Sequence, residues 1–143
     1  MTSKCFQKIF TIAPEVRHAF GIPDSVCDVR YYPPFHRSGR LFISVIDLCI
    51  RNIFSLEAEM GPVLVMYGRR HYHRQNQGFR ASYLPLFAQC IVGYINEYID
   101  KDSSFEKVLK SWRCLMAYIT GKLAEGVELE RLRAHSLRRK SAL

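Results

Sequence analysis

The chain has 143 residues, 48% of them apolar, and its 21 Lys and Arg against 13 Asp and Glu give a formal net charge of +8. This length allows one domain with a sizeable core, and the apolar content excludes a disordered or fibrous protein. The excess positive charge favours an anionic partner such as nucleic acid, a membrane surface or an acidic ligand.

Helical spacing of apolar residues governs the first half of the chain, and the alternation typical of a strand is limited to residues 26–32. A short helix is expected over residues 4–10, and it should stop before Pro14. Glycine and proline then mark a loop over residues 21–34. Because proline is tolerated in the first turn of a helix, the next helix is expected to begin near Pro34 and to bury an apolar stripe that continues to Ile53.

Helices also dominate the second half. After Gly61 and Pro62, the spacing predicts a helix over residues 63–73, a turn over 75–78, a helix over 81–99, and a last long helix that follows possible N-caps at 102–104. We expect Gly121 to loosen or end that helix. The fold class is therefore all-α, with residues 1–126 as the domain. Residues 127–143, with five basic and two acidic residues, are expected to form a basic, flexible tail.

The cysteines indicate the redox environment and exclude several kinds of site. There are five, an odd number, and no Cys-x-x-Cys motif occurs. This excludes zinc ribbons, thioredoxin-type dithiols and covalent haem attachment, and it is typical of buried, reduced thiols in a cytosolic protein. The N-terminus lacks the apolar run of a signal peptide, and no membrane-spanning segment is expected. We therefore expect a soluble cytoplasmic protein.

Two histidines in the helix expected over residues 63–73 point in different directions. His71 and His73 are two residues apart, which turns their side chains about 200° from each other. The residues three, four and seven positions before His71 are small or apolar: Gly68, Tyr67 and Leu64. The corresponding residues before His73 are Arg70, Arg69 and Met66. His71 is therefore expected to face inward, although one inward histidine is more often a hydrogen-bonded core residue than a metal ligand.

Several motifs together resemble the globin family, especially the nematode-type globins, over about residues 5–124. Met66-Tyr67-Gly68-Arg69-Arg70-His71 resembles the family's Leu-Gly-Arg-Arg-His sequence, which ends in the proximal haem ligand. Pro14 and Phe20 match the proline of the family's short third helix and the phenylalanine that packs against the haem. The other matching residues fall in family order: Val45-Ile46-Asp47, Gly78-Phe79, Phe87 and Trp112. We assign Trp112 to packing between the last two helices.

The resemblance implies a haem b group bound non-covalently by His71. A neutral imidazole is the axial ligand that haem iron requires, and its other ring nitrogen should donate to a carbonyl or hydroxyl about one turn earlier. Arg70 and Arg74, with His73, are expected to contact the haem propionates, unless they are ordinary solvated residues. Phe20, Phe79 and Tyr67 are expected haem contacts. Core packing is the alternative for each phenylalanine.

The distal side departs from the family pattern. The position where globins commonly place His or Gln to bind oxygen falls on Ser38, and helical spacing puts Ser38 on the same face as Phe42. His36 faces outward if the helix is regular from Phe35, whereas a shift of one or two residues in its start would bring His36 over the iron as a distal or sixth ligand. Phe42 and Phe6 are expected to line this side, whereas Phe10 is assigned to the core. Because serine is a short donor, fast oxygen release is expected if Ser38 occupies this position.

The N-terminal end of the chain also departs from the family pattern, because only thirteen residues precede Pro14. The resemblance thus implies a globin fold lacking the first helix and part of the second, either through truncation or because the protein dispenses with them. Such a loss should expose apolar surface on the distal and terminal helices. It favours association into a homo-oligomer and predicts marginal stability without haem or a partner.

The leading functional expectation is reversible binding of oxygen or another diatomic gas, for transport, storage or sensing. A dedicated enzymatic activity is not expected, beyond adventitious haem redox chemistry or consumption of nitric oxide. The alternative is a globin-like interaction or regulatory module with weak or lost haem binding. Basic residues cluster in 131–140, but no aromatic residue follows Tyr118 to stack on bases, so no specific nucleic-acid partner is expected.

Overall fold

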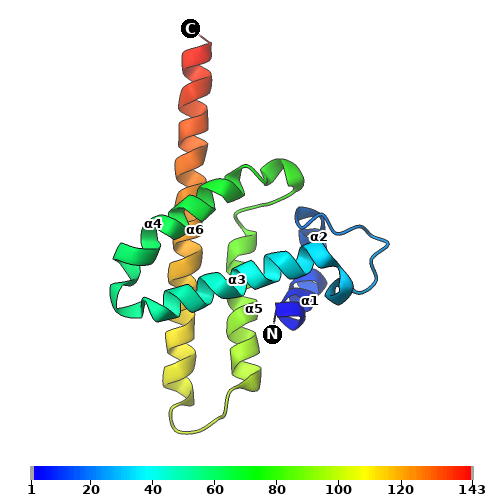
Figure 1. Cartoon of the computed structure of the whole chain (residues 1–143), viewed down its shortest axis with the longest axis vertical. Helices are drawn as coiled ribbons and strands as arrows, with labels where there is room; N and C mark the ends of the chain where they lie inside the picture. The colour runs from blue at the N-terminus through cyan, green and yellow to red at the C-terminus, as the bar shows by residue number, and fades with distance from the viewer. Residues whose placement is uncertain (1, 143) are drawn as a thin grey trace.

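The computed structural model describes residues 2–142, and within them the fold is all-α, which confirms the expected fold class (Figure 1). Short 3₁₀ turns at Val29–Tyr31, Ile53–Ser55 and Gln75–Gln77 connect some of the helices. The helices are α1 (Thr2–Ile12), α2 (Val16–Ala19), α3 (Pro33–Arg51), α4 (Leu56–Tyr72), α5 (Tyr83–Tyr98) and α6 (Phe105–Ser141).

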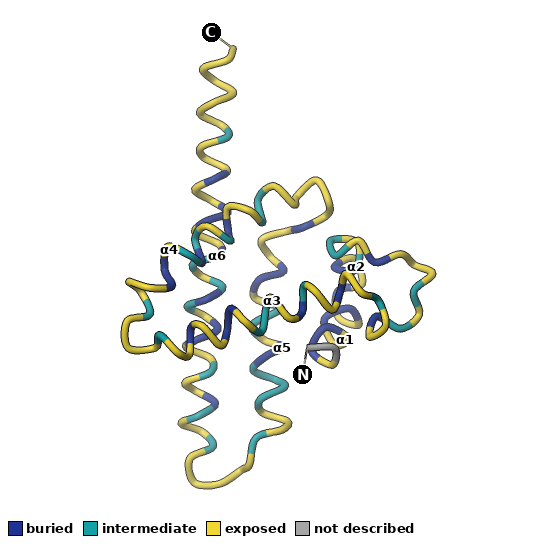
Figure 2. Tube along the Cα trace, in the orientation of Figure 1, coloured by how far each residue is buried: buried dark blue, intermediate teal, exposed yellow. Residues whose placement is uncertain are grey.

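Two apolar cores share α5. One core joins α3, α4, α5 and α6 through residues such as Cys49, Leu64, Ile91 and Met116. The other joins α1, α2 and the start of α3 to α5, and it includes Phe6, Val16, Phe35 and Cys90. Figure 1 shows α3 crossing in front of α5 and α6, and Figure 2 shows buried positions along α5 and the middle of α6. Helix α3 contributes to both cores and so joins the two halves of the molecule.

The N-terminal half follows the expected boundaries closely. Helix α3 begins at Pro33, with proline in its first two positions. The strand-like segment over residues 26–32 is a 3₁₀ turn instead, because the Asp28 carboxylate accepts a hydrogen bond from the Arg30 amide at 2.9 Å and closes the chain locally. The alternation of apolar and polar residues in this segment therefore belongs to a turn and not to a strand.

Helix α4 begins seven residues before the expected start. Pro62 lies inside the helix, so reading Gly61 and Pro62 as a helix start was wrong. A long-range contact explains the difference: the Glu57 carboxylate accepts hydrogen bonds from Tyr118 Oη at 2.6 Å and from Lys122 Nζ at 2.7 Å, both on α6. Glu57 and Glu59 also place negative charge in the first turn, where the helix dipole favours it.

Helix α6 continues through Gly121 to Ser141, and Figure 1 shows it projecting beyond the other helices. Residues 127–141, expected to form a flexible tail, are helical in the structure; Leu143 lies outside the described residues. Gly121 does not end the helix, because one glycine costs about 1 kcal/mol and the buried residues beyond it, Leu123, Gly126, Val127 and Glu130, hold the helix. Basic residues in the last turn complement the dipole.

Several large apolar side chains lie open on the surface. On α3 these are Leu41, Leu48 and Ile50, and Phe54 after α3 is fully exposed. Leu132 and Leu137 are exposed on the projecting part of α6. Apolar surface was expected on these two helices. No helix among the described residues is long and apolar enough to cross a membrane.

The cysteines divide into two groups. Cys5, Cys49 and Cys90 are buried, and burial raises the pKa of the Cys5 thiol to about 11, so that this thiol stays protonated. Cys27 and Cys114 are exposed, so the expectation of buried thiols was wrong for these two.

Candidate functional site

His71 lies in the last turn of α4 and is half-buried, which agrees with its expected inward direction. Its Nδ1 is 2.7 Å from the carbonyl oxygen of Tyr67, one turn earlier, where a partner was expected. Because a carbonyl only accepts hydrogen bonds, Nδ1 carries the proton, and Nε2 keeps its lone pair. Burial lowers the pKa of His71 below 6.5, and the Arg74 cation adds to this against the opposing Tyr67 bond. The imidazole is therefore neutral at pH 7.

The turn after α4 folds Phe79 onto His71. The two ring centroids are 5.1 Å apart, and Phe79 is buried. Gly78 makes this turn with a φ of +94°, a conformation that other residues rarely adopt. The Phe79 amide then donates to the Arg74 carbonyl at 3.1 Å. A Cβ on Gly78 would lie 3.7 Å from the Ala19 amide nitrogen, so the turn rests against α2, and Phe20 follows α2 directly.

Arg70 and Arg74 are exposed beside His71. The Arg70 guanidinium lies 5.7 Å from the ring centroid of half-buried Tyr67. Within residues 2–142, neither arginine forms an ion pair with a carboxylate, so both are available to an added anion. His73 is exposed, as expected, but its Nε2 lies 3.1 Å from the Glu130 carboxylate, a contact that was not foreseen.

An aromatic cluster forms along the first half of α3, where α1, α2 and α5 pack against it. It brings together the expected residues Phe6, Phe20 and Phe42, with the Phe6 ring 5.2 Å from Phe20 and 6.2 Å from Phe42. Phe35 and Phe87 complete this cluster at 4.9 and 5.2 Å from Phe6, and neither was predicted as a site residue. Phe35 stands seven residues before Phe42 in α3, a spacing that would have placed both on one helix face. Phe10 is buried and packs against Phe6, as expected of a core residue.

Ser38 and His36 lie on different faces of α3. Ser38 is half-buried, and its hydroxyl donates to the Pro34 carbonyl at 3.3 Å. His36 is exposed. Because α3 is helical from Pro33 onward, the shifted helix start that would have turned His36 inward does not occur. Ser38 is therefore the more enclosed of the two candidates, with its hydroxyl hydrogen already engaged.

Phe42 connects the two sides of the candidate site. It packs against the core that contains Phe79 and Leu64, and within the aromatic cluster its ring centroid lies 6.2 Å from Phe6 and 6.1 Å from Phe87. Between the described residues, no hydrogen bond, ion pair or ring contact joins His71 to Ser38, His36 or Phe42. Phe42 is therefore a distal candidate that packs against the same core as α4, the helix that carries His71.

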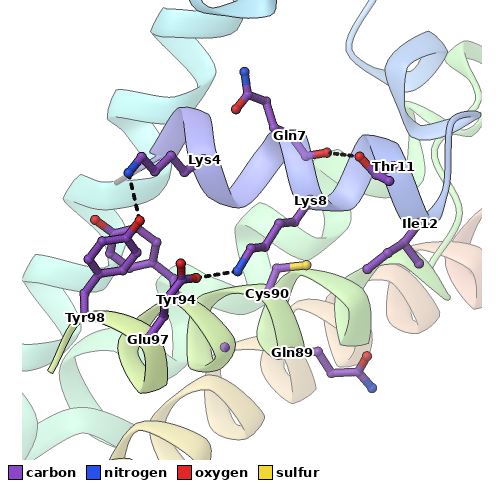
Figure 3. A pocket seen from close by; sticks show the side chains of 11 residues that line it. Lys4, Gln7, Lys8, Thr11, Ile12, Gln89, Cys90, Tyr94, Glu97 and Tyr98 are labelled. Atoms are coloured by element: carbon purple, nitrogen blue, oxygen red, sulfur yellow. Dashed lines mark hydrogen bonds and ion pairs between the residues drawn. The ribbon is translucent and has the colours of Figure 1, made fainter.

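A groove of about 590 Å³ between α1 and α5 lies apart from these residues (Figure 3). Its two lysines are already paired: Lys8 Nζ lies 2.6 Å from the Glu97 carboxylate, and Lys4 Nζ donates to Tyr98 Oη at 2.8 Å. None of the predicted site residues lines it.

The residues around His71 suit a haem group. The donor is a neutral imidazole with one nitrogen held by a carbonyl and the other free, as a haem ligand requires. Buried Phe79 packs against its ring, and exposed Arg70 and Arg74 are available to pair with carboxylates. The described residues contain no cluster of three His, Cys, Asp or Glu that suits a bare metal ion.

Comparisons with known proteins show what the chain is similar to. Residues 3–123 match the family model described as Globin. The chain is also similar to Globin-related protein glb-13 of Caenorhabditis elegans, with 25% identity over 129 residues. That similarity covers 90% of this chain but 45% of the relative, so the chain spans less than half of the relative's length. No solved structure matches the chain.

Proposed function

Because the chain belongs to the globin family, we propose that it binds haem b non-covalently through His71 Nε2 and binds oxygen or another diatomic gas reversibly. The observation that carries the proposal is the 2.7 Å contact between His71 Nδ1 and the Tyr67 carbonyl, which fixes the tautomer and the ring direction. When bound, haem would supply the iron at which the gas binds. Transport, storage and sensing are all compatible roles, and we propose no dedicated enzymatic reaction.

Each residue around His71 has a separate role in binding the haem group. His71 donates its Nε2 lone pair, and Phe79 packs against the imidazole and restricts its rotation. Arg70 and Arg74 pair with the two propionates, since both are exposed beside His71. Tyr67, one turn before His71 on the same helix face, would contact the porphyrin.

The side chains on the distal side mainly exclude water, and they offer little hydrogen bonding to a bound gas. Phe6, Phe20 and Phe42 present apolar rings that belong to or border the buried cores. Ser38 is the half-buried polar candidate on this side, but its hydroxyl hydrogen is directed to the Pro34 carbonyl. Without a strong donor, bound oxygen gains little extra stabilisation, and we expect fast release.

Absorption spectra of the ferrous protein, with and without carbon monoxide, test this proposal. Wild type reconstituted with haem should give a Soret band that shifts on adding carbon monoxide, and His71→Ala should lose the five-coordinate histidine spectrum. His18→Ala is the matched control, because His18 is an exposed histidine on α2. An unchanged spectrum in His71→Ala would refute the assignment of the ligand.

One observation favours the second candidate, an interaction or regulatory module with weak or lost haem binding. The phenylalanines of the aromatic cluster pack on one another at centroid distances of 4.9 to 6.2 Å, so this side is stabilised without any added group. The same experiment separates the two candidates, because such a module would give no Soret band that survives removal of free haem.

A further inference from the structure

Helix α6 holds α4 at three places along its length. Tyr118 and Lys122 bind Glu57 in the first turn of α4. In the middle, Gly68 and Gly126 face each other so closely that a Cβ on either would overlap the other helix's backbone. At the end, His73 meets Glu130. The helix that carries His71 is therefore fixed on α6 at its beginning, its middle and its end.

The contact at the end of α4 involves a buried carboxylate. Glu130 is 8% exposed, and among the described residues it is the buried charged side chain. Its Oε1 lies 3.1 Å from His73 Nε2 and 3.7 Å from an Arg133 guanidinium nitrogen. Because a buried charge is tolerated when it is paired, the structure holds His73 and Arg133 around this carboxylate. The restraint is mutual, so His73 is also held in place.

His73 follows the last residue of α4 and stands two residues after His71. Helix ends fray unless their final turn is anchored. Here the Tyr67 carbonyl directs the His71 ring, while the Glu130 contact anchors the backbone from which that ring extends. One hydrogen bond sets the ring's direction, and the other sets its position.

We propose that Glu130 is a positioning residue for His71, acting through His73. This inference rests on the proposed function. The Glu130 carboxylate holds the last turn of α4 against α6, so that His71 Nε2 is presented to the haem iron in one orientation. Glu130 itself touches neither the gas nor the iron.

The test compares Glu130→Ala with Glu128→Ala. Glu128 lies on the same helix, carries the same charge and pairs with Arg131 at 2.7 Å, but it is exposed. In the haem-free chain, Glu130→Ala should speed amide hydrogen exchange in residues 71–78, and Glu128→Ala should not. In the haem-loaded chain, Glu130→Ala should raise the rate of haem loss about tenfold, the lower end for residues that support a metal ligand.

Two further measurements separate positioning from a general loss of stability. The iron–histidine stretching band in resonance Raman spectra should shift or broaden in Glu130→Ala. It should remain unchanged in Ile9→Val, which destabilises the core around α1. Glu130→Gln, which can still hydrogen-bond to His73, should recover most of the wild-type behaviour.

A double substitution tests the route through His73. His73→Ala should reproduce the effect of Glu130→Ala, and the two together should add little more. Equal effects of Glu130→Ala and Glu128→Ala, or fully additive effects of Glu130→Ala and His73→Ala, would overturn the inference. Haem binding by wild type with unchanged haem loss in Glu130→Ala overturns this inference alone, whereas a wild-type chain that binds no haem overturns the proposed function as well.

Discussion

Replacing Gly126 by alanine should weaken the fold at the place where α4 and α6 cross. A Cβ on Gly126 would lie 2.1 Å from the Val65 carbonyl oxygen, and one on Gly68 would lie 2.1 Å from the Leu123 carbonyl oxygen. A carbon and an oxygen in van der Waals contact are about 3.3 Å apart, so the helices must separate by about 1 Å. Both obstructing atoms belong to the backbone and cannot rotate away.

The size of the effect follows from two opposing contributions. Overpacking typically costs 1–3 kcal/mol, and we take about 3 kcal/mol because the clash is with backbone. Alanine in place of glycine within a helix recovers about 1 kcal/mol, which leaves a net loss of about 2 kcal/mol. Gly121 is the matched control on the same helix, since a Cβ there would have no atom within 4 Å. Gly121→Ala should therefore stabilise the chain by about 1 kcal/mol.

Thermal unfolding of both variants, followed by circular dichroism in the same haem state, measures the difference. A gap of about 3 kcal/mol in a chain of this size corresponds to about 10 °C in Tm between Gly121→Ala and Gly126→Ala. If Gly126→Ala melts together with Gly121→Ala, the close crossing does not stabilise the fold and the reasoning fails.

Three other predictions concern the distal side, the haem-free state and high pH. Oxygen should leave the wild-type protein quickly, and Ser38→His should slow release about tenfold in flash photolysis or stopped-flow, because it adds a donor; equal rates would contradict this. The haem-free chain should melt below about 60 °C, and a cooperative melt of the monomer well above that temperature would contradict the expected marginal stability. Burial and the bond to Glu57 raise the pKa of Tyr118 to about 12, above its usual 10.0. The stability this provides should be complete below pH 10 and lost as pH rises towards 12, and Tyr118→Phe should lack that loss in unfolding measurements.

The features that the sequence predicted well depend on short-range spacing. The inward direction of His71 followed from the residues three, four and seven positions earlier, and the structure places it half-buried. The start of α3 followed from the two prolines that open it. In both cases, the residues that decide the structure lie within two helical turns.

The features that were missed depend on residues far apart in the chain. Tyr118, which stabilises Glu57 at the start of α4, lies 61 residues later in the chain. Local spacing does not reveal this contact, so it predicts a helix boundary at Pro62 although α4 passes through that residue. The contact of Glu130 with His73 spans 57 residues, so local spacing gave no sign that α6 is held against α4 at this point. Helical spacing identifies which face of a helix is buried, but it does not identify what lies against that face.

The unbroken course of α6 has a mechanical consequence. With 37 residues and a rise of about 1.5 Å per residue, it is a rod about 55 Å long, and no glycine or proline follows Gly126 within it. Sharp kinks in helices arise mainly at glycine and proline, so the projecting end of α6 contains no residue at which the helix would bend sharply. A sideways force on residues 131–141 would therefore act as a lever about the Gly126 crossing and would be felt at the turn of α4 that holds His71.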